Sequence, residues 1–552
     1  MARQSTTPVS FQKSSRPDTA VLMSSGRAGV VQPVCYIPLL AGDSASGKVG
    51  IDIQLKEMPK PLLNGVFANF QAWFVPKSAH PQFPGRDELL HARTGQVIKS
   101  LGMADRTPPA FFQPLGVAGW GSLDIFKRLG MHFETGTNIN SDLLDAFSVI
   151  YNFRLAAHSS RLARRQYTAE GISAGACPPA FWPSSRFSRI VPDYERALVV
   201  GSLDLDVIAG QLPVSGIGFG GVPQAPALGT AIRGVNAAAD FASDAIDAVT
   251  NLTGGNPGVV IRGTGASLAA MRPQVFAEMA GTRVSVTLAD IDSARKTQAF
   301  AKLRASYAGN DTTGFDNDDT LVAHLMQGIS VQPDDFRRPW LLDSARVAVG
   351  FAERHASDGA NLAQSVTLGR ASCTLRLNVP NQDVSGLIIV TVEVLPERID
   401  ERQSDEFMQI TAVSGLPNAL RDAQRIEPVD LVLNRRIDAK HATPGGVYGH
   451  EPMNDKWSRD FTRLGGDFYM ATPGGGWTQN RSAIWQHEIV NPIFGTSHFL
   501  APAPFPHDVF ADQNADAFEV VCRHAVSIVG LTQMGDALVE NSDDYGVVEN
   551  TL

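Results

Sequence analysis

The stretch FANFQAWFVPKS, residues 67–78, shows the most regular pattern in the chain. Apolar residues occupy every second position from Val66 to Phe74, while the alternate positions mix amide and aromatic side chains. Alternation of this kind predicts a β-strand, and Pro76 ends its hydrogen-bonding ladder because proline has no N–H. One apolar face and one half-apolar face are typical of a sheet in a β-sandwich, or of a surface that meets other subunits.

Three other stretches predict strands by the same kind of pattern. KVGIDIQLKEM (48–58) alternates apolar and polar residues, VSGLIIVTVEVLPER (384–398) is typical of a buried strand, and DAFEVVCRHAVSIVGL (516–531) predicts a last strand. Leucine and aromatic residues spaced by three and four predict a helix over 141–165, with Ser141 as its N-cap. Strands separated by long loops, with few helices, predict a mainly β fold of the sandwich type.

Composition and charge restrict the classes of function. The chain has 552 residues, 43% hydrophobic and 19% charged, as expected of a globular protein with several cores. Its formal net charge of −9 excludes a surface that binds nucleic acid everywhere, but allows local basic patches. No run approaches the roughly 18 apolar residues of a membrane span, and the N-terminal segment has no apolar core of a secretory signal. We therefore expect a protein made in a cytoplasm, whose four widely separated cysteines are free thiols.

Changes in composition predict four parts of the chain. Residues 1–20 are rich in Ser and Thr and carry Arg and Lys, which predicts a basic, extended N-terminal arm. Residues 21–208 form the first part of the sandwich, with the helix at 141–165 inserted. Residues 209–285 are rich in Gly, Pro and Ala and poor in charge, and such a long irregular segment predicts an insertion at the surface. Residues 286–552 hold the remaining strands and their loops.

Motifs of enzymes occur in the chain without the context that they need. GISAG (171–175) matches G-x-S-x-G around Ser173, but Pro178 and Pro179 forbid the helix that must follow a nucleophile elbow. GIGFGG (216–221) matches G-x-G-x-x-G, yet flanking prolines leave no helix N-terminus for a phosphate, which favours a flexible loop. The histidines and acidic runs lack metal-ligand spacing. We expect no catalytic residue, no metal and no cofactor.

Basic residues gather in the N-terminal arm and in RLARR (161–165), at the end of the predicted helix. Contact with a nucleic-acid backbone needs only positive charge, whereas a solvated surface or a favourable helix dipole would explain the same residues. The residues proposed to face DNA are Arg3, Lys13, Arg16, Arg161, Arg164 and Arg165.

Several short stretches, in order, resemble one family. They are Gly29, Pro33, LLAGD (39–43), AWFVPKS (72–78), VIYNFR (149–154), DIDSARKTQAF (290–300), QPDDFRRPWLL (332–342) and VYGHEPMNDKWSRD (447–460). Together they resemble the major capsid protein of microviruses, the small single-stranded DNA bacteriophages, and within these the gokushovirus-like group. The chain departs from the family pattern at His450, where Tyr is usual, and at Pro452, and residues 170–285 match little.

The resemblance implies an eight-stranded jelly-roll β-sandwich with long inserted loops. It implies a structural capsid protein that self-assembles into a small icosahedral virion shell around a circular single-stranded DNA genome, without catalysis. The implied partners are further copies of the chain, the DNA, other virion proteins (DNA-binding and pilot proteins) and a host receptor that the residues do not identify. Assembly is expected in the cytoplasm of the bacterial host.

The resemblance also gives the insertion at 209–285 a role. In gokushoviruses the large insertion forms protrusions around the threefold axes, so we expect an outward projection that could serve in host attachment. Neighbouring copies would bury its apolar residues, and those proposed are Ile217, Phe219, Val222, Leu228 and Ile232. The alternatives are a β-sandwich carbohydrate-binding or adhesion module, for which a secretory signal is expected, and a hydrolase acting through Ser173.

Overall fold

The structure is a computed structural model of the 552-residue chain. It describes residues 11–83, 86–98, 105–116, 123–159, 162–171, 175–192, 214–220, 233–235, 258–260, 274–279, 296, 338–355, 365–425, 429–458, 462–469, 483–486 and 489–535. The chain divides into two compact units, Met1–Leu198 with Leu303–Leu552, and Val199–Lys302.

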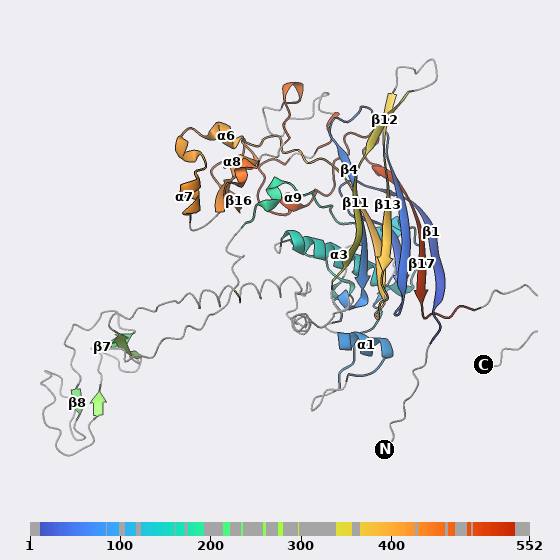
Figure 1. Ribbon diagram of the computed structural model, residues 1–552, viewed down its shortest axis with the longest axis horizontal. Helices are drawn as coiled ribbons and strands as arrows, with labels where there is room; N and C mark the ends of the chain where they lie inside the picture. The colour runs from blue at the N-terminus through green and yellow to red at the C-terminus, as the bar shows by residue number, and fades with distance from the viewer. Residues whose placement is uncertain are drawn as a thin grey trace, which may run out of the picture. The chain divides into compact units, whose positions relative to one another are not determined.

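Two antiparallel sheets form the body of the first unit, and Figure 1 shows their strands standing side by side. The order of the five-stranded sheet is β1 (Ser14–Gly26), β17 (Phe518–Gly530), β3 (Ser44–Leu55), β13 (Ser365–Val379) and β12 (Gly350–His355). The order of the four-stranded sheet is β11 (Trp340–Ala348), β4 (Val66–Pro76), β14 (Gly386–Pro396) and β2 (Gln32–Leu39). All neighbouring strands in both sheets are antiparallel.

The inner faces of the two sheets share one hydrophobic core. The alternate residues of β3 from Val49 to Leu55, and those of β4 from Val66 to Phe74, are each at most 1% exposed. The period-two patterns therefore predict the buried faces correctly, because successive side chains of a strand point to opposite sides. The strands predicted at the four stretches are β3, β4, β14 and β17, and the mainly β class is confirmed.

Helix α3 (Asp142–His158) packs on the outer face of the four-stranded sheet, against β4 and β14. The ring of Phe153 meets Trp73 edge-on, with 6.0 Å between centroids, and Arg154 forms an ion pair with the buried Glu393. This cover explains why the second face of β4 is half-apolar.

The helix predicted over 141–165 is confirmed, but it ends seven residues early. Ser141 takes the N-cap position as predicted, and the extended backbone of Ser159 ends the helix. Arg164 and Arg165 consequently lie beyond the last turn, where they have no part in the helix dipole that the sequence suggested.

The N-terminal arm was predicted over residues 1–20, but strand β1 already begins at Ser14. Residues 14–20, which composition places in the arm, belong to β1, and this strand pairs with β17 along its whole length. A polar sequence forms a strand here because β17 supplies the backbone partners, and context of this kind overrides intrinsic preference. Arg16 is held in place by Asp43 and by the hydroxyl of Thr532.

The second unit contains two pairs of antiparallel strands among its described residues. β7 (Val214–Gly220) pairs with β10 (Gln274–Met279), and β8 (Arg233–Val235) pairs with β9 (Gly258–Val260). The prediction of a flexible loop at GIGFGG is therefore wrong for residues 216–220, which belong to β7. Glycine here does not prevent pairing, because β10 supplies the ladder.

The remaining elements are short. The helices are α1 (Arg86–Thr94), α2 (Asp124–Arg128), α6 (Glu406–Gln409), α7 (Ala419–Ala423), α8 (Asn434–Ile437) and α9 (Thr496–Phe499). The strands are β5 (Pro114–Gly116), β6 (Asn138–Asn140), β15 (Val429–Leu433) and β16 (Val447–Pro452). The 3-10 helices are η1 (Lys77–Ala79), η2 (Thr168–Glu170), η3 (Arg186–Arg189), η6 (Val413–Gly415), η7 (Asp455–Trp457) and η8 (Gly466–Phe468). Within the described ranges, no helix is both long enough and apolar enough to cross a membrane.

Candidate functional site

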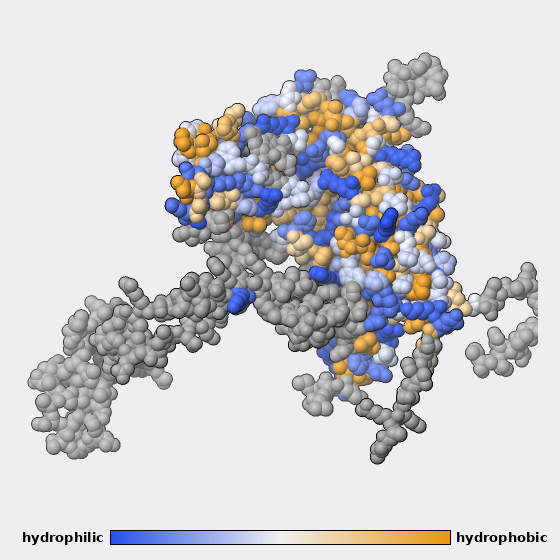
Figure 2. Space-filling view, in the orientation of Figure 1, coloured by the Kyte–Doolittle hydropathy of each residue, from blue (hydrophilic) through white to orange (hydrophobic). Residues whose placement is uncertain are grey.

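An apolar surface lies on the segment that carries α6, η6 and α7, residues 405–423, named here the 405–423 surface. Met408, Val413 and Leu420 are each between 78% and 84% exposed, and Phe407 is also exposed. Figure 2 shows hydrophobic residues gathered over α6 and α7. Helices of four or five residues cannot turn every large apolar side chain inward, so these side chains face solvent.

Hydrogen bonds hold the backbone of the 405–423 surface in one conformation. The side chain of Asn418 accepts hydrogen bonds from the backbone N–H of Leu420 and of Arg421, both at 3.1 Å. The guanidinium of Arg421 donates to the carbonyls of Ser414, at 2.7 Å, and Leu416, at 2.6 Å. A rigid, exposed apolar surface is typical of a protein–protein contact, since ordering it costs little on binding.

A second apolar region is a cavity of about 890 Å³ beside the outer side of β2. Aromatic side chains line it, and Phe112 and Leu40 at this cavity are exposed. Lys77 lies 5.1 Å from the ring of Phe111 and pairs with Asp142. Burial lowers the pKa of Lys77 and raises that of Asp142, so for both groups the cost of burial outweighs their attraction. The cavity is wide enough to receive an apolar segment of a partner.

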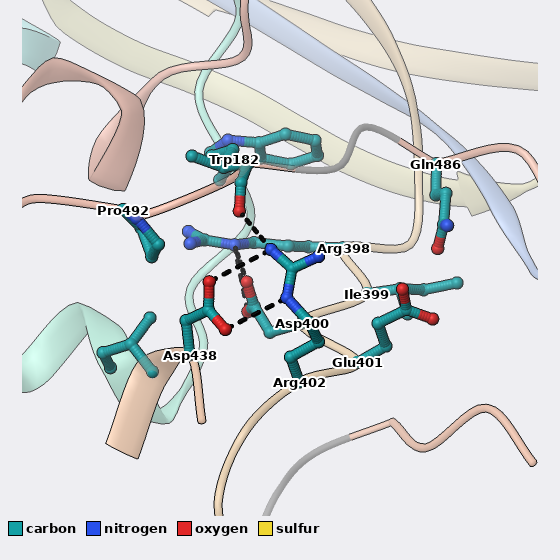
Figure 3. A pocket seen from close by; sticks show the side chains of 11 residues that line it. Trp182, Arg398, Ile399, Asp400, Glu401, Arg402, Asp438, Gln486 and Pro492 are labelled. Carbon is teal, nitrogen blue, oxygen red and sulfur yellow. Dashed lines mark hydrogen bonds and ion pairs between the residues drawn. The ribbon is translucent and has the colours of Figure 1, made fainter. Parts of the chain in front are cut away.

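A network of buried charges lies where the chain leaves the four-stranded sheet (Figure 3), named here the Arg402–Asp438 network. The guanidinium of Arg402 donates to both carboxylate oxygens of Asp438, at 3.0 and 3.1 Å, and to the carbonyl of Ile489 at 2.9 Å. Arg398 pairs with Asp400 at 3.1 Å. These groups line a cavity of about 40 Å³.

The chemistry open to the Arg402–Asp438 network follows from its size and its pairing. A space of this volume holds about one or two water molecules, and no organic substrate fits. Both arginines are engaged by carboxylates and carbonyls within the protein. The network therefore joins three segments far apart in the sequence: the one after β14, the one that carries α8, and the one around Ile489.

Only some of the residues proposed to face DNA lie at the surface. Lys13 is exposed, and Arg16 is paired with Asp43. Arg164 forms a bidentate ion pair with Glu170, at 2.9 and 2.7 Å. Arg3 and Arg161 lie outside the described residues.

Arg165 is half-buried, which sequence reasoning did not foresee. Its guanidinium donates to Ser148 Oγ at 3.1 Å and to the carbonyl of Ala176 at 2.8 Å. Burial lowers the pKa of Arg165. A guanidinium with these partners ties the loop after α3 to the helix.

The residues proposed for the protrusion are described only on β7. Ile217 stands opposite Ala277, and Phe219 stands opposite Val275, in the pairing of β7 with β10. Val222, Leu228 and Ile232 lie outside the described residues.

Ser173 also lies outside the described residues, but the segment that follows it is described. Pro178 and Pro179 are extended and pair with the backbone near Gly29, so the helix that a nucleophile elbow needs is absent at this place, as predicted. Among the residues that the structure describes, no group of three or more His, Cys, Asp or Glu side chains could hold a metal ion.

The lowered pKa of His498 predicts that the folded protein loses stability in acid. Burial, and next the charge of Arg398, lower the pKa of His498 to about 4. Because the pKa falls on folding, this histidine contributes stability above its ordinary pKa of 6.5 that is lost as the pH falls towards 4. The shift corresponds to about 3 kcal/mol. The pKa values of His80, His158 and His507 are also lowered, chiefly by burial.

We expect the free energy of unfolding to decrease between pH 6.5 and pH 4, and His498→Gln to reduce that slope. Urea unfolding at several pH values measures both slopes. Equal slopes for the wild type and the variant would show that His498 does not titrate as its burial requires.

No family model matches the chain, and no curated protein matches it.

Proposed function

We propose that this chain is a structural capsid protein that self-assembles into a small icosahedral shell around circular single-stranded DNA. The observation that carries the proposal is the strand order. If the long strands β1, β2, β3, β4, β11, β13, β14 and β17 are numbered one to eight, the sheets read 1-8-3-6 and 5-4-7-2. With the short edge strand β12 of the five-stranded sheet set aside, this order supports the proposal of a jelly roll, an arrangement of two Greek keys that is found in viral capsid proteins.

The jelly roll also occurs in lectins and cupins, so the fold needs support from the residues that carry the family resemblance. AWFVPKS spans the end of β4 and the start of η1, and VIYNFR lies in the middle of α3. Within VIYNFR, the hydroxyl of Tyr151 donates to the carbonyl of Pro179 at 3.1 Å, and Arg154 pairs with Glu393. These side chains hold the helix, the outer sheet face and the 178–182 segment together. This structural role gives a reason for these residue types to occur together in the motif.

The 405–423 surface supports the assembly part of the proposal. A shell forms only if every copy presents surfaces that other copies can bury, and rigid apolar side chains are the residues that contribute most to such contacts. We assign the 405–423 surface to contact between copies of the chain.

The insertion and the N-terminal arm complete the proposal. Residues 209–285 would project outward around the threefold axes and take part in host attachment, with Ile217 and Phe219 in β7. Lys13 and the arm before β1 would contribute positive charge to DNA contact. The other virion proteins would join the shell during assembly in the host cytoplasm.

Production of the chain together with the other proteins of its virion tests the proposal. We expect rapidly sedimenting particles that contain the chain and protect circular single-stranded DNA from nuclease. A monomer that forms no particle but binds immobilised glycans would favour the alternative, a carbohydrate-binding or adhesion module.

A further inference from the structure

The cavity of about 890 Å³ beside β2 has a polar part, which is built around Lys77. The backbone N–H of Lys77 donates to the carbonyl of Ser385 at 2.7 Å, and its ammonium pairs with Asp142. The backbone N–H of Asp142 in turn donates to the side chain of Asn140 at 2.9 Å. The backbone N–H of His80 donates to the carbonyl of Lys77 at 3.2 Å. These contacts bring five polar residues of the cavity wall together.

Apolar side chains from four segments line the rest of the cavity. They include Tyr36, Pro38, Leu39 and Leu40 of β2 and the turn after it, Phe126 of α2, Met131 and Phe133 of the segment between α2 and α3, and Leu531 after β17. The rings of Phe126 and Phe133 meet edge-on, with 5.2 Å between centroids. Tyr36, Leu40 and Leu531 are between 39% and 51% exposed. The apolar part is therefore partly open to solvent.

Lys77 and His80 are the most deeply buried groups of the polar part, each at most 2% exposed. The ammonium of Lys77 lies 5.1 Å from the ring of Phe111 and 5.2 Å from that of Phe112. Burial lowers the pKa of Lys77 although Asp142 pairs with it, so a further anion would stabilise its charged form. Nδ1 of His80 has no hydrogen-bond partner among the residues that the structure describes, whereas buried polar atoms are nearly always paired.

The charges at the cavity favour an anionic ligand. Among the described residues that line it, two cations, Lys77 and Arg93, stand against one carboxylate, Asp142. Burial, and next the charge of Lys77, lower the pKa of His80 well below its ordinary value, so its imidazole is neutral at neutral pH. Arg93 is exposed, and its guanidinium donates to the carbonyl of Asp383 at 3.4 Å. A long hydrogen bond to a neutral acceptor leaves this guanidinium able to pair with a bound anion.

We propose that the cavity binds a long-chain fatty acid, with its carboxylate at Lys77 and Arg93 and its hydrocarbon chain against the apolar side chains. A volume of about 890 Å³ lies in the range of cavities that enclose a small ligand. The apolar wall removes the chain from water, which is favourable in proportion to the area buried. A carboxylate oxygen accepts a hydrogen bond from His80 when Nδ1 carries the hydrogen. A neutral or cationic amphiphile would leave the excess positive charge without a partner.

The proposal is independent of the proposed capsid function. The described residues that line the cavity all belong to the first unit of one copy. A single chain in solution should therefore bind the fatty acid whether or not it forms a shell.

Titration of the full-length protein with palmitate below its micelle concentration tests the proposal, with displacement of the fluorescent fatty acid cis-parinarate as the signal. We expect saturable binding of one palmitate per chain. Hexadecanol has the same chain length and no charge, and it should bind about tenfold more weakly or worse, since a hydrogen bond between charged groups contributes at least a factor of this size. Equal affinities for palmitate and hexadecanol, or no saturable binding, would overturn the proposal.

Arg93→Gln tests the place of the carboxylate. The variant should bind palmitate about tenfold more weakly and hexadecanol as the wild type does, because only the charged head loses a partner. The side chain is exposed, so the fold should be retained. The matched control is Arg376→Gln, which changes an exposed arginine on β13 of the other sheet and should leave both affinities unchanged. Wild-type affinity of Arg93→Gln for palmitate would contradict a carboxylate at Arg93.

Photolabelling tests the place of the hydrocarbon chain. A palmitate analogue with a diazirine at its terminal carbon should label residues 36–41 or 126–139 after irradiation, as identified by mass spectrometry of the digested protein. Ala41→Trp places an indole ring in the cavity and should abolish both binding and labelling. Labels found only elsewhere, for example on the 405–423 surface, would show adsorption to exposed apolar side chains and would refute the site.

Discussion

Replacement of Met408, Val413 and Leu420 together by serine is expected to abolish particle formation while the chain stays folded. These side chains are the most exposed of the 405–423 surface, so their loss removes little packing within one copy. Burial of such side chains against another copy contributes about 1.5–3 kcal/mol each. Because every copy repeats the contact, a loss of several kcal/mol per contact stops assembly.

Sedimentation measures the particles, and circular dichroism of the soluble chain measures the fold. The matched control carries Met408→Leu, Val413→Ile and Leu420→Met, which keep the surface apolar and should preserve assembly. If the serine variant assembled as the wild type does, the 405–423 surface would not be a contact between copies.

Asp438→Ala removes one partner of the Arg402–Asp438 network, which joins three segments of the chain. We expect this change to lower the free energy of unfolding of these segments by about 3–5 kcal/mol. Asp438 is 2% exposed at its side chain and Arg402 is 8% exposed, so removal of the carboxylate leaves a buried guanidinium without its main partner. The backbone N–H of Lys440 also loses the oxygen that accepts its hydrogen bond at 2.9 Å.

Urea unfolding followed by tryptophan fluorescence measures this loss, since Trp182 lies at the cavity of the network. Glu519→Ala is the matched control: its carboxylate pairs with Lys56 at the surface, and its removal should cost at most about 1 kcal/mol. The double variant Arg402→Leu with Asp438→Ala should recover most of the lost stability, because no charge is then left buried. A cost below about 1 kcal/mol for Asp438→Ala would contradict the buried-pair account.

The central strands β3, β4, β14 and β17 were predictable from the pattern of apolar residues along each strand. In β3, β4 and β17 the residue type at each second position is decided by the core, whereas β14 is buried on both faces and was predicted from its continuous apolar run. β1 was not predictable from composition, since its polar residues pair with a strand some 500 positions away in the chain. β7 was missed for a related reason: glycine suggests a loop unless its partner strand is known.

The charged residues show the limit of the same reasoning. Arg402 and Asp438 are 36 positions apart, and Arg154 and Glu393 are 239 apart, so no local spacing marks either pair. A count of positive charges grouped Arg165 with residues facing DNA, whereas the fold turns its guanidinium towards Ser148. The tertiary structure decides which charged residues pair with each other. These pairs, and the exposed apolar surfaces, are therefore seen only in the fold.

Electron cryomicroscopy of particles assembled from this chain and the other virion proteins tests the central claim most directly. The account predicts small icosahedral shells whose wall is built from the two packed sheets, with density for residues 209–285 projecting outward around the threefold axes. A chain that remains a soluble monomer under every assembly condition, with the other virion proteins present, would contradict it.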